Sequence, residues 1–423
     1  MSFKIDPKLE TLSARVIKKT ADVFSNIDTI TEYNQQKVLS AFIENRVSES
    51  HFTATTGYGY GDRGREVLER VFAQVMGAED ALVRHSILCG THAITVALFG
   101  VLRPGDLLLS VTGTPYDTLL GVIGADKESA GSLAEYGVRY REVALQADGS
   151  PDLEGIRRAL TEESAVKVVH IQRSRGYNLR PSLLVDKIGE IVRVVREVRP
   201  EAIVFVDNCY GEFAEKTEPT AVGVDLMAGS LIKNPGGGIA ENGGYICGRR
   251  DLVELCSYRL STPGLGREVG ASLGHNRTLF MGLFNAPHVV GEAMKTAVFA
   301  AAIAEELGYR CTPAWDERRA DIIQAIQLKT PEALIAFCQG IQSGAPVDAF
   351  VVPEPWDMPG YDNQVIMAAG AFTMGSSIEL SADAPLREPF AVYMQGGLNF
   401  HSGKVGVLLA VQAMLDKHIV ELK

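Results

Sequence analysis

The chain has 423 residues, of which 46% are hydrophobic and 22% charged, and its 41 basic and 52 acidic side chains give a formal net charge of −11. This length predicts two or three domains, because a domain averages roughly 150 residues. The composition excludes a disordered chain or a fibre. The negative charge excludes nucleic acid and anionic membranes as expected partners, since both repel an acidic surface.

The cysteines and the N-terminal segment indicate where the protein works. The six cysteines show no C-x-x-C spacing, and Cys247 lies in an apolar run. This pattern predicts reduced thiols and no metal site. Residues 1–7 lack the apolar stretch of a signal peptide, and no run approaches the roughly 18 apolar residues of a membrane helix. We therefore expect a soluble, cytoplasmic protein.

The first half of the chain alternates between helical and strand patterns. Residues 27–47 have helical spacing, and a loop at 57–64 with four glycines precedes a helix at 66–76. The next predicted elements are strands at 81–84, 107–111, 138–143, 166–171 and 202–206, with helices from 91, at 151–160 and at 182–198. Ser150 and Pro151 form a favourable helix start. This alternation predicts an α/β fold with a mostly parallel sheet.

The pattern changes near residue 291, where a long alanine-rich helix at 292–307 precedes mixed segments and a last helix at 405–419. We expect a helical segment at 1–50 that packs with the small domain, a large domain at 51–290 and a smaller α+β domain at 291–423. The domain boundary should lie within or beside the long helix.

The glycine-rich loop matches G-x-G-x-x-G from Gly59 to Gly64, which is a weak indication of dinucleotide binding. That function needs an acidic residue at the far end of the second strand, whereas Glu79 and Asp80 precede the strand at 81–84. The loop is therefore either a flexible surface segment or a source of phosphate donors, namely Tyr58, Tyr60 and Arg65.

Two later motifs place reactive groups at strand ends. Asp207 directly follows the apolar run 203–206, and ligands bind at this edge of open α/β sheets. Lys233 ends a second apolar run and enters a glycine-rich loop. Burial penalises a lysine charge, which favours use of this lysine as an amine. A turn-capping aspartate and an ordinary surface lysine are the alternatives.

Gly90 and Thr91 begin a predicted helix, where free N–H groups and a hydroxyl form an anion site. Tyr116 comes just after the predicted strand at 107–111, and so also lies near a strand end. The chain thus supplies a phosphate cradle, an aromatic platform, a carboxylate and a lysine, which is the set that pyridoxal 5'-phosphate (PLP) requires.

With these motifs in place, the chain resembles the fold-type I PLP enzymes, in particular the cystathionine β- and γ-lyases. It resembles more closely the methionine γ-lyase-like proteins, also called aluminium-resistance proteins. The matching segments span nearly the whole chain and lie at 57–60, 82–85, 89–93, 206–213, 231–238 and 392–397.

The resemblance implies the fold of PLP-dependent transferases (aspartate aminotransferase-like) and a role for each matching residue. Lys233 should form the Schiff base, Asp207 should pair with the pyridinium nitrogen, and Tyr116 should stack on the ring and act as an acid. The other residues that should contact the cofactor are Gly90, Thr91, His92, Tyr210 and Ser230, with Tyr58 and Tyr60 reaching it from a neighbouring subunit. This arrangement implies a homodimer or homotetramer with shared active sites.

The sequence departs from the better-known lyases at two places. It has Tyr58-Gly59-Tyr60 with Arg65 in place of their Tyr-x-Arg pattern, and Ile232 where they carry threonine. These departures leave the substrate open. Arg175 and Arg387 are rival anchors for the substrate carboxylate, and the alternative partner of Arg175 is the ring hydroxyl of the cofactor. His92 has either a cofactor contact or a structural role.

The expected function is a PLP-dependent carbon–sulfur lyase that carries out β- or γ-elimination on a small sulfur-containing amino acid, of the cystathionine, methionine or cysteine type. One alternative keeps the cofactor but assigns an aminotransferase or aldolase. An alternative of another class is a non-catalytic protein that holds PLP.

Overall fold

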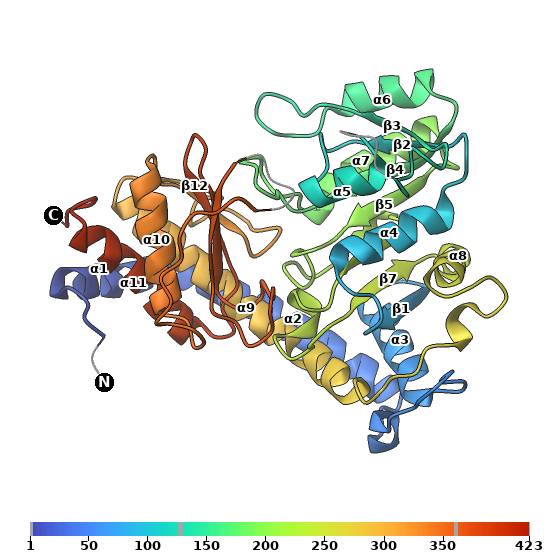
Figure 1. Ribbon diagram of the computed structural model, residues 1–423, viewed down its shortest axis with the longest axis horizontal. Helices are drawn as coiled ribbons and strands as arrows, with labels where there is room; N and C mark the ends of the chain where they lie inside the picture. The colour runs from blue at the N-terminus through green and yellow to red at the C-terminus, as the bar shows by residue number, and fades with distance from the viewer. Residues whose placement is uncertain (1–2, 126–129, 359–362, 423) are drawn as a thin grey trace. The chain divides into compact units, whose positions relative to one another are not determined.

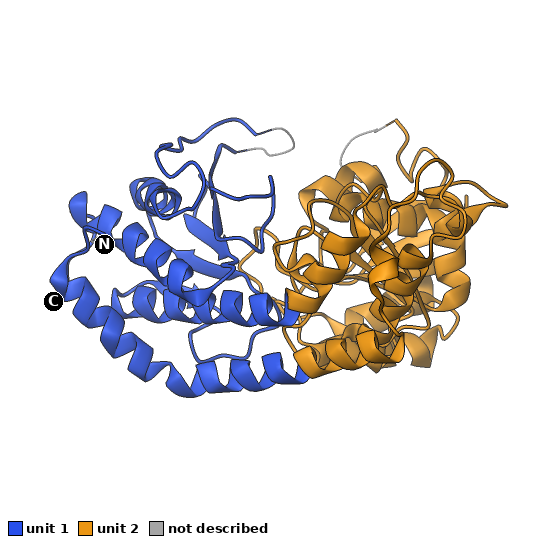
Figure 2. Ribbon diagram, turned by 90° about the horizontal axis from the view of Figure 1, so that it is seen from below, with its two compact units in different colours: residues 1–33, 286–423 blue, residues 34–285 orange. Residues whose placement is uncertain are grey.

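The computed structural model describes residues 3–125, 130–358 and 363–422 (Figure 1). It divides into two compact units, which Figure 2 colours separately. Unit 1 combines residues up to 33 with those from 286 onward, and unit 2 comprises Asn34–Asn285. Both divisions fall inside long helices, α2 (Ala21–Glu44) and α9 (Asn276–Glu306). The sequence placed the second division near 290, which also lies inside α9, and the first near 50, beyond the end of α2.

Unit 2 contains a mixed sheet with the strand order β1-β7-β6-β5-β4-β2-β3. Its strands are β1 (Asp80–Arg84), β2 (Leu107–Ser110), β3 (Arg139–Glu142), β4 (Val166–Gln172), β5 (Ile203–Asp207), β6 (Leu226–Ser230) and β7 (Gly244–Gly248). Its remaining helices are α3 (Arg63–Val75), α4 (Gly90–Val101), α5 (Asp117–Ile123), α6 (Leu153–Glu162), α7 (Val185–Val198) and α8 (Arg250–Leu260). The short 3-10 helices of this unit are η1 (Glu49–Phe52), η2 (Pro219–Val222), η3 (Asn234–Gly236) and η4 (Gly266–Glu268).

The direction of the strands brings the predicted motifs to one edge. Strands β3, β2, β4, β5 and β6 are mutually parallel, and β7 is antiparallel to both β6 and β1. The carboxyl ends of β1, β2, β4, β5 and β6 therefore share one edge of the sheet. Every residue of β2, β6 and β7 is buried, so helices cover both faces there, as a largely parallel sheet requires. The predicted α/β fold class is confirmed.

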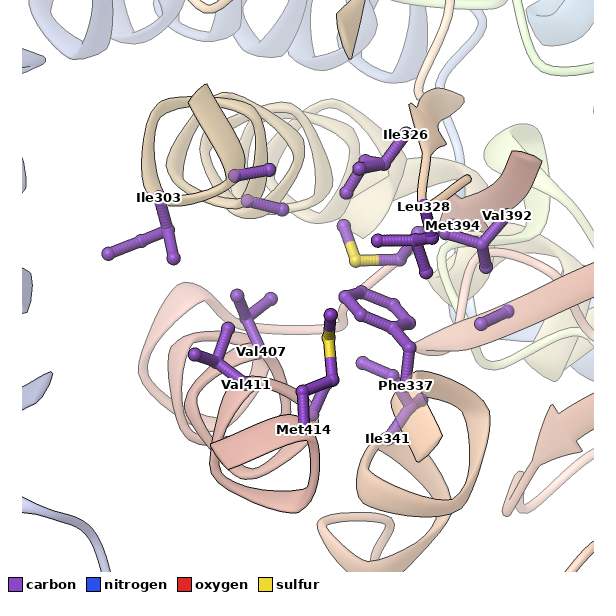
Figure 3. Close-up of a cluster of buried hydrophobic side chains, with 14 of the residues drawn as sticks. Ile303, Ile326, Leu328, Phe337, Ile341, Val392, Met394, Val407, Val411 and Met414 are labelled. Carbon is purple, nitrogen blue, oxygen red and sulfur yellow. The ribbon is translucent and has the colours of Figure 1, made fainter. Parts of the chain in front are cut away.

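Unit 1 contains a wholly antiparallel sheet with the order β10-β11-β12-β9-β8. Its strands are β8 (Arg310–Thr312), β9 (Gln324–Gln327), β10 (Val365–Ala369), β11 (Ser381–Pro385) and β12 (Ala391–Gln395). Its helices besides parts of α2 and α9 are α1 (Pro7–Lys19), α10 (Pro331–Ser343) and α11 (Phe400–Asp416). Side chains from α9, α10, α11 and the sheet form one apolar core (Figure 3).

The predicted helix starts at 27, 151, 292 and 405 all differ from the structure, and local contacts explain two of these differences. Helix α6 begins after Asp152, whose carboxylate accepts from the N–H of Gly155, and not after Ser150. The Ser150 hydroxyl is instead engaged in a turn with Asp148. Helix α9 begins at Asn276, 16 residues before the predicted start at 292 (292 − 276 = 16). The aromatic residues Phe280 and Phe284 in this first part pack edge-to-face on Phe42 of α2, a tertiary contact that helical spacing alone does not reveal.

Across the described ranges, no helix is both long and apolar enough to cross a membrane. The same part of the chain contains no cluster of three or more His, Cys, Asp or Glu side chains arranged to hold a metal ion.

Candidate active site

Asp207 is the last residue of β5, and its half-buried carboxylate lies at the functional edge of the sheet. Oδ1 accepts a hydrogen bond of 3.1 Å from the backbone N–H of Cys209. Burial raises the pKa of Asp207, and the positive charge of Lys233 acts in the opposite direction. The carboxylate and the amine are thus close enough to influence each other's charge.

Lys233 lies three residues beyond the end of β6, at the start of the short 3-10 helix η3. Its Nζ lies 3.8 Å from the centroid of the Tyr210 ring. Burial acts to lower the pKa of Lys233, but Cys209, Tyr210 and Asp207 outweigh it and raise this pKa. The loop is tightly folded, because a Cβ atom on Gly236 would lie 1.7 Å from the carbonyl oxygen of Leu231.

The first turn of α4 forms a cradle beside β6. A Cβ atom on Gly90 would lie 3.0 Å from Cys209 Sγ and 3.4 Å from Ser230 Cβ, so any larger residue here would crowd these two side chains. The Ser230 hydroxyl is buried and has no hydrogen-bond partner among the described residues. A buried hydroxyl in this state is costly unless a ligand satisfies it. Together with the N–H groups of Gly90 and Thr91 in the first turn of the helix, it suits an anion such as phosphate.

Tyr116 and His92 lie at the starts of two helices, α5 and α4. The backbone N–H of Tyr116, at the start of α5, donates to Gln172 Oε1 at 2.7 Å. His92 accepts a hydrogen bond of 3.0 Å from the N–H of Leu88 at Nδ1, so this nitrogen has a structural role in the turn before α4. The hydroxyls of Thr91 and Thr118 are 3.0 Å apart, which links the starts of α4 and α5.

The glycine-rich loop presents two tyrosines to solvent. Tyr58 and Tyr60 are 71% and 58% exposed, and their rings stack with centroids 5.5 Å apart. Arg65 is buried and donates to the carbonyl oxygens of Gly59 and Gly270 at 2.9 and 2.7 Å. The Arg65 guanidinium thus fixes the loop within its own chain, and a role for Arg65 as a phosphate donor stays a prediction.

The two candidate anchors for a carboxylate belong to different units. Arg175 is buried in the segment between β4 and α7 of unit 2. Arg387 is exposed in the turn that follows β11 of unit 1.

Sequence reasoning missed a buried polar network beside the site. Arg173, which is 0% exposed, donates to Asn208 Oδ1 at 2.8 Å and to Glu215 at 3.0 Å, and pairs with Glu218 at 3.5 Å. Two more members are Glu212 and Tyr245, whose hydroxyl donates to Glu212 Oε1 at 2.6 Å. Burial raises the pKa of Glu212 to about 8. Two features of the sequence could have indicated this network: Arg173 directly follows β4, and Asn208 directly follows Asp207.

Comparison with solved structures defines the fold class. The PLP-dependent protein YhfS from Escherichia coli is 16% identical, with a TM-score of 0.59 over 92% of this chain and 97% of that one. At this identity the likeness shows the fold alone, which is that of the fold-type I PLP-dependent enzymes.

The chain belongs to the methionine gamma-lyase family, whose model matches residues 9–415. The uncharacterised protein YnbB of Bacillus subtilis (strain 168) is 49% identical over 413 residues, which cover 97% of this chain and 98% of YnbB. A carbon-sulfur lyase involved in aluminum resistance from Clostridium novyi NT is 51% identical, with a TM-score of 0.93 and 96% of each chain covered. The family resemblance predicted from the motifs is confirmed.

Proposed function

We propose that the chain is a PLP-dependent carbon–sulfur lyase that acts on a small sulfur-containing amino acid by β- or γ-elimination. The observation that carries this proposal is the placement of Asp207, Lys233 and the unpartnered Ser230 hydroxyl at the ends of two adjacent strands. Membership of the methionine gamma-lyase family and the name of the Clostridium novyi relative support the reaction class.

The donor set fits PLP. Ser230 and the first turn of α4, at Gly90 and Thr91, would hold the phosphate, and Asp207 would hold the ring nitrogen. Lys233 would hold the aldehyde carbon. When bound, PLP supplies an electron sink for the carbon that loses its proton.

The chain's own residues would move the protons. The Lys233 amine, once free and neutral, would take the proton from the substrate's α-carbon as a general base. Asp207 would remain ionised and keep a proton on the ring nitrogen through a charge-assisted hydrogen bond. The Tyr116 hydroxyl would protonate the leaving sulfur. Arg175 and Arg387 are the two candidates to bind the substrate carboxylate, and the correct one should raise KM when changed to Lys.

We also propose that two subunits share each site, so that the working protein is a homodimer or homotetramer. Tyr58 and Tyr60 support this, because they extend into solvent from a loop that Arg65 fixes from the inside. Exposed aromatic side chains with hydroxyl donors suit a phosphate on a second copy related by a two-fold axis.

The cofactor assignment is tested by incubating the purified protein with PLP, reducing with borohydride and mapping the labelled peptide. A pyridoxyl group on Lys233 is expected, and a label on any other lysine would contradict the assignment. Asp207→Asn should keep the label but lose most turnover, because an amide cannot stabilise the ring proton as a carboxylate does.

The reaction is tested by supplying cystathionine, methionine, cysteine and homocysteine to the loaded protein. Release of a keto acid with a thiol, without an amino acceptor, is expected for a lyase. Stoichiometric conversion of the cofactor to its amine form would favour an aminotransferase. A labelled protein that turns over none of these and cleaves no hydroxy amino acid would favour a PLP-holding protein.

A further inference from the structure

Two buried asparagines hold the turn that follows Asp207. Asn234 donates from Nδ2 to the carbonyl oxygens of Tyr210 and Glu212 at 2.8 and 2.9 Å. Asn34 donates from Nδ2 to the carbonyl oxygens of Phe213 and Glu215 at 3.1 and 2.9 Å. Both side chains are 0% exposed. Each asparagine therefore stabilises the segment 210–215 in the same way, by donating two hydrogen bonds from its side-chain amide to backbone carbonyl oxygens.

The backbone of this turn needs such support. Tyr210 and Phe213 have φ values of 73° and 62°, in the left-handed region that residues other than glycine rarely occupy. Each such residue costs on the order of 1 kcal/mol or more, and the conformation persists only where the surroundings impose it. The asparagine hydrogen bonds end on the carbonyl groups of these two residues and of their near neighbours.

The two asparagines differ in what they join to the turn. Asn34 comes from α2, whereas Asn234 is the residue directly after Lys233. The Asn234 hydrogen bonds therefore connect the lysine loop to the turn that carries Asp207 and Tyr210. Lys233 also contacts the turn directly, because its Nζ lies 3.8 Å from the centroid of the Tyr210 ring.

We propose that Asn234 is a positioning residue that fixes the Lys233 loop against the Asp207–Glu212 turn and so sets where the lysine amine lies. The assignment rests on the proposed function, in which Lys233 carries the cofactor. Asn34 stabilises the same turn and has no part in placing the lysine. The pair thus offers a matched comparison within one protein.

Removal of either side chain takes its donor from one buried and one half-buried carbonyl group, so both variants should be destabilised to a similar degree. Only removal of Asn234 frees the loop that holds the amine. Proximity effects in catalysis are steep, and a misplacement of about 1 Å can cost on the order of a hundredfold in rate. The consequence should therefore appear in the reactivity of Lys233.

The experiment compares Asn234→Ala and Asn34→Ala in the full chain, freed of cofactor and tested below the urea concentration at which either unfolds. The rate of PLP attachment to Lys233 is followed by borohydride quenching and peptide mass spectrometry. Asn234→Ala should attach PLP about ten- to a hundredfold more slowly than the unchanged protein. Asn34→Ala should stay within about twofold of it, as expected for an uncoupled site.

A second readout needs no cofactor. Acetic anhydride labelling of the cofactor-free protein across pH reports the exposure and charge of the Lys233 amine, which faces Asp207, Cys209 and Tyr210. Labelling of Lys233 should become faster in Asn234→Ala and remain unchanged in Asn34→Ala. Asn234→Asp has the same size, and its protonated form keeps one donor, so it should lie between the unchanged protein and Asn234→Ala in both readouts.

The outcomes separate the inference from the function on which it rests. Equal slowing of attachment in Asn234→Ala and Asn34→Ala, with Lys233 still labelled in the unchanged protein, would overturn the positioning role alone. Absence of a label on Lys233 in the unchanged protein would overturn the proposed function. If Asn234→Ala does not fold, Asn234→Asp decides, and attachment at the unchanged rate in that variant would contradict the inference.

Discussion

The polar edge of the unit 2 sheet and the apolar core of unit 1 are buried in opposite ways. Around the turn after β5, the buried groups include Arg173, Asn208 and Glu212, joined by hydrogen bonds and ion pairs. In unit 1, the buried cluster consists of apolar side chains such as Ile303, Phe337 and Met414 (Figure 3). Apolar burial stabilises a fold without demanding one exact arrangement, whereas a buried polar network is satisfied in few geometries. The polar edge is therefore suited to hold reactive groups, and the apolar core to keep a unit folded.

The largest effect on function should come from Lys233→Ala at the polar edge. This variant should lose the covalent pyridoxyl label and all lyase turnover, because the change removes the amine that follows β6. The free energy of unfolding, measured with urea, should change little. If Lys233→Ala were strongly destabilised and still carried the label, Lys233 would serve the stability of the fold and not the function of the polar edge.

Arg173→Met should have the largest effect on stability. The change removes the buried guanidinium that pairs with Glu215 and Glu218, and breaking a buried pair in this way costs about 3–5 kcal/mol. Urea unfolding measures the loss, and PLP attachment to Lys233 should also slow, because Asn208 loses its donor. A variant as stable as the unchanged protein would show that the network does not fix the turn.

Phe337→Ala in the apolar core of unit 1 should lose about as much stability as Arg173→Met, without an effect on the site. Deleting a buried phenylalanine costs about 3–5 kcal/mol through lost transfer energy and a cavity. Below the urea concentration at which this variant unfolds, PLP attachment to Lys233 should match that of the unchanged protein. Equal impairment of attachment in this variant and in Arg173→Met would remove the distinction between the two regions.

Tyr58→Phe/Tyr60→Phe should weaken cofactor affinity by about ten- to a hundredfold, because the pair then loses a charge-assisted contact to a phosphate dianion, which contributes about 1.5–3 kcal/mol in total. Mixed with Lys233→Ala protein and reassembled, the double variant should regain part of its activity, because one hybrid site receives intact residues from both chains. No recovery from two folded, dimeric parents would show that the loop serves its own subunit.

Glu212→Gln should have the smallest effect, visible as a change of pH dependence. Burial raises the pKa of Glu212 from 4.5 to about 8. Between these values the folded state keeps a proton that the unfolded state releases, so stability falls as pH rises, by up to about 1.4 kcal/mol per pH unit. Glu212→Gln should remove this slope. Urea unfolding between pH 7 and 8 keeps the contribution of His170 small, because burial lowers the pKa of this residue from 6.5 to about 4 and the unfolded chain is mostly deprotonated there as well. An unchanged slope would show that Glu212 is ionised in the fold.

Much of the site was predictable, because each motif follows a strand and parallel strands end at one edge. Asp207 after β5 and Lys233 after β6 needed only the apolar runs before them. The supporting network was not predictable in the same way. Asn34 and Phe213, or Arg173 and Glu218, meet only through tertiary packing, and no local pattern pairs them. The true start of α9 was missed for the same reason.

Cys89 adds a practical consequence to the cradle at the start of α4. It is the N-terminal cap of that helix and the one exposed thiol, since the other five cysteines are buried. A thiol-directed reagent should therefore modify Cys89 well before the others, next to the groups that would bind phosphate. A fluorophore attached there would report occupancy of the cradle in real time, and protection of this single thiol by inorganic phosphate would reveal binding without any turnover.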